Sequence, residues 1–128
     1  RLEREKRYDR LLDIAAELQE RGFAFHWYFV GDGPLREELE EKRDALGLGS
    51  CVTLTGYMEN PCPLLARCDA LVLFSEYEGT PVTIDEAKTL GVPVIANDVG
   101  GVREMLQDGR YGKIASDSEG FIKRIAQL

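Results

Sequence analysis

Two glutamates flank the start of a predicted helix and could accept hydrogen bonds from hydroxyl groups. Glu78 lies just before that helix, and Glu86, eight residues later, lies one to two turns into it. Carboxylates at these two places can bind sugar hydroxyls on either side of a diphosphate. In the simpler interpretation, Glu78 only favours the helix dipole and Glu86 is a surface charge.

The residues between the two glutamates suit a phosphate. Gly79 would let the backbone approach a ligand closely. Thr80 suits the N-cap of the following helix and Pro81 its first position. The amides of Val82 and Thr83 would then point out of the helix start, where free N–H groups and the helix dipole hold anions.

The rest of the chain alternates between helical and strand patterns. Helices are expected over residues 8–18, from 34 to about 46, and over 61–67, 82–90, 101–106 and 119–128. Strands are expected over residues 23–30, 51–55, 70–74, 92–96 and 111–115. Alternation with short loops predicts one α/β domain over residues 1–128. Its fold is expected to be a Rossmann-like, doubly wound parallel sheet with helices on both faces.

Ligands of such folds bind beyond the carboxyl ends of the strands. The segments to inspect are therefore 31–34, 57–60, 75–83 and 97–101. Gly31 and Gly33 follow one strand and Tyr57 follows the next. These glycines could serve only to turn the chain, and Tyr57 could only pack against its neighbours.

Composition excludes several classes of protein. The 128 residues carry 23 acidic and 16 basic side chains, a net charge of −7, which disfavours a nucleic-acid surface. No apolar run approaches a membrane span, and a mostly charged start is unlike a signal peptide. Three cysteines (Cys51, Cys62, Cys68) and the single His26 lack zinc-site spacing. We expect small buried thiols in a reducing, cytoplasmic compartment, a histidine that packs within a strand, and no metal.

The chain resembles retaining glycosyltransferases of the two-domain GT-B type, family 4 (group 1). Glu78 and Glu86 carry the resemblance, in the context Glu-Gly-Thr-Pro followed by Asp-Glu-Ala and Gly-Val-Pro-Val-Ile-Ala. Further matching segments occur in the family's order over residues 1–6, 29–34, 52–57 and 98–104. One departure is Arg7, because the family usually has glycine after the matching lysine.

The resemblance implies roles for individual residues. Glu78 would be the catalytic residue that contacts the donor sugar, and Glu86 would bind the ribose hydroxyls. Arg1 and Lys6 would neutralise the donor diphosphate, in place of a metal ion. Tyr57 would lie against the base. Gly31 and Gly33 match the family's glycine-rich strand end, and the amides of residues 80–83 would hold phosphate and sugar.

The resemblance also implies the larger protein. The chain would be the donor-binding domain of an enzyme that moves a hexose-type sugar from a nucleoside diphosphate, such as a UDP-sugar, in polysaccharide biosynthesis. No cofactor is implied. An acceptor-binding first domain and the first strand of this domain are expected to lie outside the sequence. Any contact with the inner face of the membrane would be made through that other domain. We expect the chain alone to bind donor and to transfer nothing.

Three alternatives stay open. One is another GT-B reaction, such as sugar-nucleotide epimerisation or phosphorolysis, because fold does not fix function. A phosphorylase would need a lysine for a pyridoxal cofactor in a distinctive context, which the sequence lacks. A second is a non-catalytic module that binds a nucleotide sugar. The third is a receiver-like or flavodoxin-like signalling domain, although Asp32 and Asp98 lack the setting of a phosphoacceptor.

Overall fold

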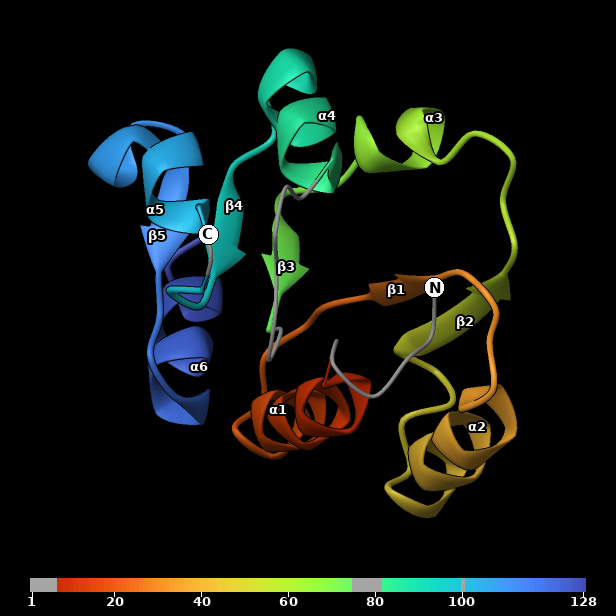
Figure 1. The fold of residues 1–128 in the computed structure, drawn as a ribbon. Helices are drawn as coiled ribbons and strands as arrows, with labels where there is room; N and C mark the ends of the chain where they lie inside the picture. Colours follow the sequence, from red (N-terminus) through yellow and green to blue (C-terminus); the bar gives the residue numbers. More distant parts are fainter. Residues whose placement is uncertain (1–6, 75–81, 100) are drawn as a thin grey trace. The chain divides into compact units, whose positions relative to one another are not determined.

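The computed structural model describes residues 7–74, 82–99 and 101–128, drawn in colour in Figure 1. The chain forms two compact units, Arg1–Glu59 and Asn60–Leu128. The first unit contains α1 (Tyr8–Glu20), β1 (Trp27–Val30), α2 (Arg36–Ala45) and β2 (Val52–Gly56). The second contains α3 (Cys62–Leu65), β3 (Leu71–Leu73), α4 (Val82–Leu90), β4 (Val94–Ala96), α5 (Val102–Met105), the 3-10 helix η2 (Gln107–Gly109), β5 (Gly112–Ile114) and α6 (Ser118–Ala126).

In the first unit, two helices lie side by side next to a parallel strand pair (Figure 1). The buried face of α1 is apolar and comprises Leu11, Leu12, Ile14, Ala15 and Leu18. In contrast, α2 buries only Leu39. The remainder of α2 is highly charged, and Lys42 ties it to α1 through a 3.0 Å ion pair with Asp13. The core of this unit therefore lies between α1 and the strands, where Phe29 is also buried.

In the second unit, three parallel strands follow the order β3–β4–β5. All three residues of the central strand β4 are buried. Val94 and Ala96 belong to a cluster with Ile84 and Ala87 of α4. Because side chains alternate along a strand, Ile95 points to the opposite face. There α6 packs against β4. This unit therefore carries helices on both faces of its sheet.

Aromatic packing and a helix cap fix α6 in this unit. Phe74, at the end of β3, stacks on Phe121 of α6 with ring centroids 4.6 Å apart. The Asp117 carboxylate caps α6 and accepts a 2.7 Å hydrogen bond from the Gly120 amide.

The predicted α/β, Rossmann-like class is confirmed, because every pairing between the named strands is parallel and helices connect and flank them. Four of the five strands are shorter than predicted: β3 and β5 by one residue at each end, and β1 and β4 at their start. The strand expected from Phe23 begins at Trp27 because the Phe23 amide bonds to Leu18 and completes the end of α1. The strand expected from Val92 begins at Val94 because the Val92 amide bonds back to Ala87 in α4.

The length and polarity of the described helices show whether any of them could span a membrane. Across the three described ranges, none of the helices combines the length and apolar character that a bilayer crossing requires.

Candidate functional site

The predicted site residues divide into three sets. Six of them lie outside the described residues: Arg1, Lys6, Glu78, Gly79, Thr80 and Pro81. Gly31, Gly33 and Tyr57 belong to the first unit, beyond the ends of β1 and β2. Val82, Thr83 and Glu86 belong to the second unit, in the first two turns of α4. Each described set therefore follows the carboxyl end of a parallel strand.

Two glycines join the ends of β1 and β2. The Gly31 amide donates a 3.0 Å hydrogen bond to the Gly56 carbonyl. Gly31 has a φ of 127° and Gly56 a φ of 77°, values that favour glycine. The glycine-rich turn and the segment before Tyr57 thus lie together, as their positions after neighbouring parallel strands predict.

Arg36 of α2 lies close to both of these strand ends. Its guanidinium lies 3.3 Å from Asp32 and 2.9 Å from Glu40. A Cβ built on Gly56 would lie 3.0 Å from the Arg36 Nη1 atom. The hydrogen bond that Arg36 donates to Glu40, followed by the charge of Asp32, raises the pKa of the Arg36 guanidinium.

Asp32 also shapes the glycine-rich turn itself, because its carboxylate accepts a 2.8 Å hydrogen bond from the Gly33 amide. Spacing could have shown the importance of Arg36, since Asp32 and Glu40 stand four residues before and after it.

Tyr57 follows directly on Gly56 and is 77% exposed. This exposure contradicts the alternative that Tyr57 only packs against its neighbours, as far as the described residues are concerned. An exposed aromatic ring beyond a strand end can stack against a planar base.

The start of α4 carries the second described set of predicted site residues. Ile84 and Ala87 face the core, whereas Thr83 is exposed and Glu86 is half-buried. The Glu86 Oε2 atom lies 3.8 Å from the Cys62 Sγ atom, close enough for a thiol hydrogen bond. Sequence reasoning missed Cys62, because it treated this residue as one of three similar thiols.

The end of β4 lies in the same unit. Asn97 is buried, and its amide bonds to the Leu73 carbonyl at 3.3 Å. The next residue, Asp98, forms a 2.9 Å ion pair with Arg103, and both side chains are about half exposed. This ion pair gives Arg103 a structural role beside the end of β4.

The cysteines and the histidine differ in part from expectation. All three thiols are free and half-buried rather than fully buried. Burial raises the pKa of the Cys51 and Cys68 thiols, with a further contribution from the charge of Asp69 at Cys68. His26 is exposed and precedes β1, where it contacts the Tyr28 ring and lies 2.7 Å from the Thr53 hydroxyl. No cluster of potential metal ligands occurs within the described parts of the chain.

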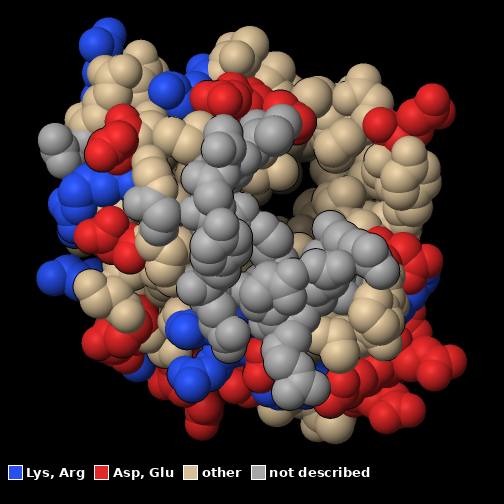
Figure 2. Space-filling view, in the orientation of Figure 1, with Lys and Arg blue, Asp and Glu red and all other residues tan. Residues whose placement is uncertain are grey.

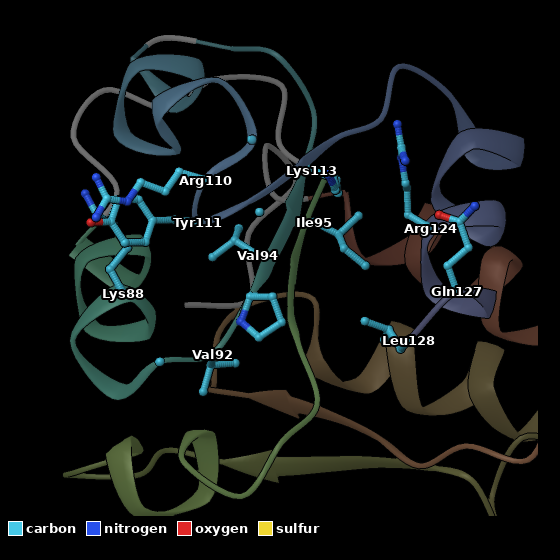
Figure 3. A pocket seen from close by; sticks show the side chains of 14 residues that line it. Lys88, Val92, Val94, Ile95, Arg110, Tyr111, Lys113, Arg124, Gln127 and Leu128 are labelled. Atoms are coloured by element: carbon cyan, nitrogen blue, oxygen red, sulfur yellow. The ribbon is translucent and has the colours of Figure 1, made fainter.

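A cavity of about 470 Å³ lies at the other end of the second sheet, beside the amino ends of β4 and β5 (Figure 3). Its floor includes Val92, Val94 and Ile95, and basic side chains such as Lys88 and Arg110 lie around it. Lys88 stands over the Tyr111 ring, 4.6 Å from the ring centroid. None of the predicted site residues lines this cavity.

Charge is mixed on the face drawn in Figure 2, where several basic side chains gather at the left, over β5 and its neighbouring helices. The basic residues of those elements include Arg103, Lys113, Lys123 and Arg124, and Arg110 lies between η2 and β5.

Comparisons with known proteins give a consistent family. The model of the family described as "Glycosyl transferases group 1" matches residues 1–128. Over 114 residues, the chain is 36% identical to the alpha-D-kanosaminyltransferase of Streptomyces kanamyceticus, and it covers 30% of that protein. This alignment includes 88% of the present chain. A putative glycosyltransferase of Bacillus subtilis, EpsF, is 42% identical over 88 residues, which are 69% of this chain and 23% of that protein. The chain thus spans less than a third of either relative.

Solved structures agree with this result. A mutant of TarM from S. aureus, solved with fondaparinux, alpha-GlcNAc-glycerol and UDP, has a TM-score of 0.93 at 25% identity. The match covers 100% of this chain and 27% of TarM. HepE from Anabaena, solved with UDP and glucose, has a TM-score of 0.87 at 27% identity, covering 99% of this chain and 36% of HepE.

Proposed function

The chain belongs to the group 1 glycosyl transferases, and on that premise we propose that it is the donor-binding domain of a retaining glycosyltransferase. The whole enzyme would move a sugar from a nucleoside-diphosphate sugar to an acceptor hydroxyl. UDP is present in the TarM and HepE structures, which supports a nucleotide-sugar donor here.

One observation carries the proposal. The predicted nucleotide-contacting residues that the structure describes all follow the carboxyl ends of parallel strands. Ligands of α/β sheets bind at this edge. The cavity near Lys88 lies at the amino ends of its strands and is therefore the weaker candidate.

The described residues suit the nucleotide part of the donor. The exposed ring of Tyr57 would lie against the base, beside the turn that contains Gly31 and Gly33. The Glu86 carboxylate would accept hydrogen bonds from the ribose hydroxyls. The amides of Val82 and Thr83, at the start of the nine-residue helix α4, would hold a phosphate oxygen.

The remaining predicted residues would act on the diphosphate and the sugar. Arg1 and Lys6 would stabilise the negative charge that develops on the leaving diphosphate, with no metal ion required. Glu78 would position the sugar while positive charge develops at its anomeric carbon. The amides near Gly79 and Thr80 would donate further hydrogen bonds to the phosphate and the sugar. Pro81 cannot donate one, because it has no N–H.

The proposal implies a second domain that binds the acceptor, as the coverage of the longer relatives supports. The enzyme would act in the cytoplasm, and any membrane contact would be made through that second domain.

A binding titration tests this function. We expect one of UDP, GDP and ADP to bind to the protein, and Glu86→Ala to weaken that nucleotide about ten- to a hundredfold. This range corresponds to the loss of a charge-assisted hydrogen bond, about 1.5 to 3 kcal/mol. Isothermal titration calorimetry gives both dissociation constants.

Asp85→Ala is the matched control for this experiment. Asp85 is the neighbouring carboxylate on α4, is exposed, and lies in the first turn of the helix. Its removal should leave nucleotide affinity within about twofold, because an exposed carboxylate is screened by salt. Equal losses in the two variants would show a general charge effect and contradict the ribose-binding role of Glu86.

A further inference from the structure

We propose that Cys62 positions the Glu86 carboxylate for the donor ribose and so contributes to recognition of the ribose hydroxyls. This inference rests on the proposed function, because it assigns a second residue to the same nucleotide site. Cys62 would act through Glu86 and is a positioning residue.

The contact joins two helices of one unit. Cys62 is the first residue of α3 and Glu86 lies on α4, and these helices pack together (Figure 1). The thiol Sγ atom lies 3.8 Å from Glu86 Oε2, and both side chains are half-buried. Within the described parts of the chain, Glu86 has no other hydrogen-bond donor. Among the described residues, the Cys62 thiol is therefore the group that orients the Glu86 carboxylate.

The backbone around Cys62 holds the thiol in place. The Asn60 side chain accepts a 3.2 Å hydrogen bond from the Cys62 amide at the start of α3. Pro61 precedes the helix and Pro63 follows Cys62, which restricts the backbone on both sides. A thiol on a restricted backbone is a weak donor, but it is an oriented one.

Orientation matters because a glutamate side chain has several rotatable bonds. A half-buried glutamate that is free to turn loses conformational entropy when it binds a ligand. A donor that engages Oε2 in advance leaves Oε1 and the remaining lone pairs directed toward a diol. The ribose 2′ and 3′ hydroxyls form such a diol.

The other two thiols make a different kind of contact. Cys51 donates to the Leu48 carbonyl at 3.7 Å, and Cys68 donates to the Leu64 carbonyl at 3.4 Å. Each acceptor belongs to the same local turn as its cysteine. Cys62 instead reaches a carboxylate 24 residues away in the sequence. This difference makes Cys68 a matched control for removal of a half-buried thiol.

The experiment measures dissociation constants by calorimetry for two ligands. The first is whichever of UDP, GDP and ADP binds most tightly, and the second is its 2′,3′-dideoxy form. We expect Cys62→Ala to weaken the ribonucleotide about two- to fivefold, as the loss of a modest hydrogen bond would. Cys62→Ser should retain the affinity, because a hydroxyl also donates. Affinity for the dideoxynucleotide should not change in either variant.

A double-mutant cycle separates positioning from a structural role. Adding Cys62→Ala to Glu86→Ala should cause no further loss of affinity, because the thiol would have no carboxylate to direct. Cys68→Ala should bind both ligands as the unaltered protein does. Equal weakening of both ligands by Cys62→Ala, or no weakening of either, would overturn the inference.

The two proposals fail in different ways. If Glu86→Ala does not weaken the ribonucleotide, or none of the three nucleotides binds, the proposed site fails and the role of Cys62 with it. If Glu86→Ala weakens binding while Cys62→Ala does not, only the role of Cys62 is wrong. Thermal unfolding of each variant shows whether a loss of affinity reflects a loss of fold.

Discussion

Arg7 holds a left-handed backbone conformation at the N-cap of α1, with φ 49° and ψ 43°. A residue with a Cβ atom adopts this conformation at a cost of roughly 1 to 2 kcal/mol, whereas glycine adopts it freely. The resemblance to family 4 predicts a glycine at this position. The conformation gives a physical reason for that preference, because glycine adopts it without strain.

The predicted effect of Arg7→Gly is a gain in stability. The free energy of unfolding should rise by about 0.5 to 1 kcal/mol, because relief of the strained conformation exceeds the entropy that glycine adds to the unfolded chain. Urea denaturation followed by circular dichroism measures the change. Arg10→Gly is the control, since this exposed position inside α1 should lose about 1 kcal/mol. A loss of stability in both variants would show that Arg7 is not strained.

At the scale of single residues, the sequence predicts local structure but not contacts between residues that are far apart in the chain. The pattern around Glu86 placed it correctly in a helix, because the helical period and the preceding proline are local signals. The contact with Cys62 depends on how α3 packs against α4, and no local pattern contains that information. The six predicted residues outside the described ranges remain predictions.

At the scale of the elements, β4 organises the second unit. This strand is central and buried on both faces, so its neighbours must approach it closely. Gly112 begins β5 and pairs with Val94. A Cβ built on Gly112 would collide with the Val94 backbone carbonyl, whose position the sheet fixes. The absence of a side chain at this position therefore permits the β4–β5 pairing.

Gly112→Ala should consequently destabilise this sheet. We expect a loss on the order of 3 kcal/mol in the free energy of unfolding, because backbone must move to relieve the overlap. Hydrogen exchange should also show faster exchange at the amides of β4 and β5. In Gly49→Ala, the new Cβ would meet only the Asp44 carboxylate at 3.9 Å, so this control should change stability little. If the two variants are equally stable, the inferred close approach of Gly112 to the Val94 backbone is wrong.

Element types were easier to predict than element ends. The apolar runs and the helical period predicted each strand and each α-helix, because burial on a sheet or along a helix face repeats locally. The ends at Trp27 and Val94 instead depend on hydrogen bonds that complete α1 and α4. The 3-10 helix at Gln107–Gly109 was not predicted, and Gln107 adopts a φ of 49° that a sequence pattern does not reveal.

At the scale of the whole molecule, each unit offers a carboxyl edge and an amino edge of its sheet. The candidate donor residues follow carboxyl ends in both units, whereas the cavity near Lys88 lies at the amino ends of β4 and β5 (Figure 3). An acidic chain with a net charge of −7 needs local donors to hold a diphosphate, because its overall field repels anions. In the proposed function, the amides at the start of α4 would be donors of this kind.

The most direct test of the central claim maps where a nucleotide diphosphate binds. Amide chemical shifts of the protein should be followed during titration with UDP, GDP and ADP. The account predicts that one nucleotide shifts the amides of Gly31, Gly33, Tyr57 and residues 82–86. The amide chemical shifts of residues that line the cavity near Lys88, such as Tyr111, should not change. Shifts confined to the cavity, with none at the carboxyl ends of the strands, would contradict a donor site there.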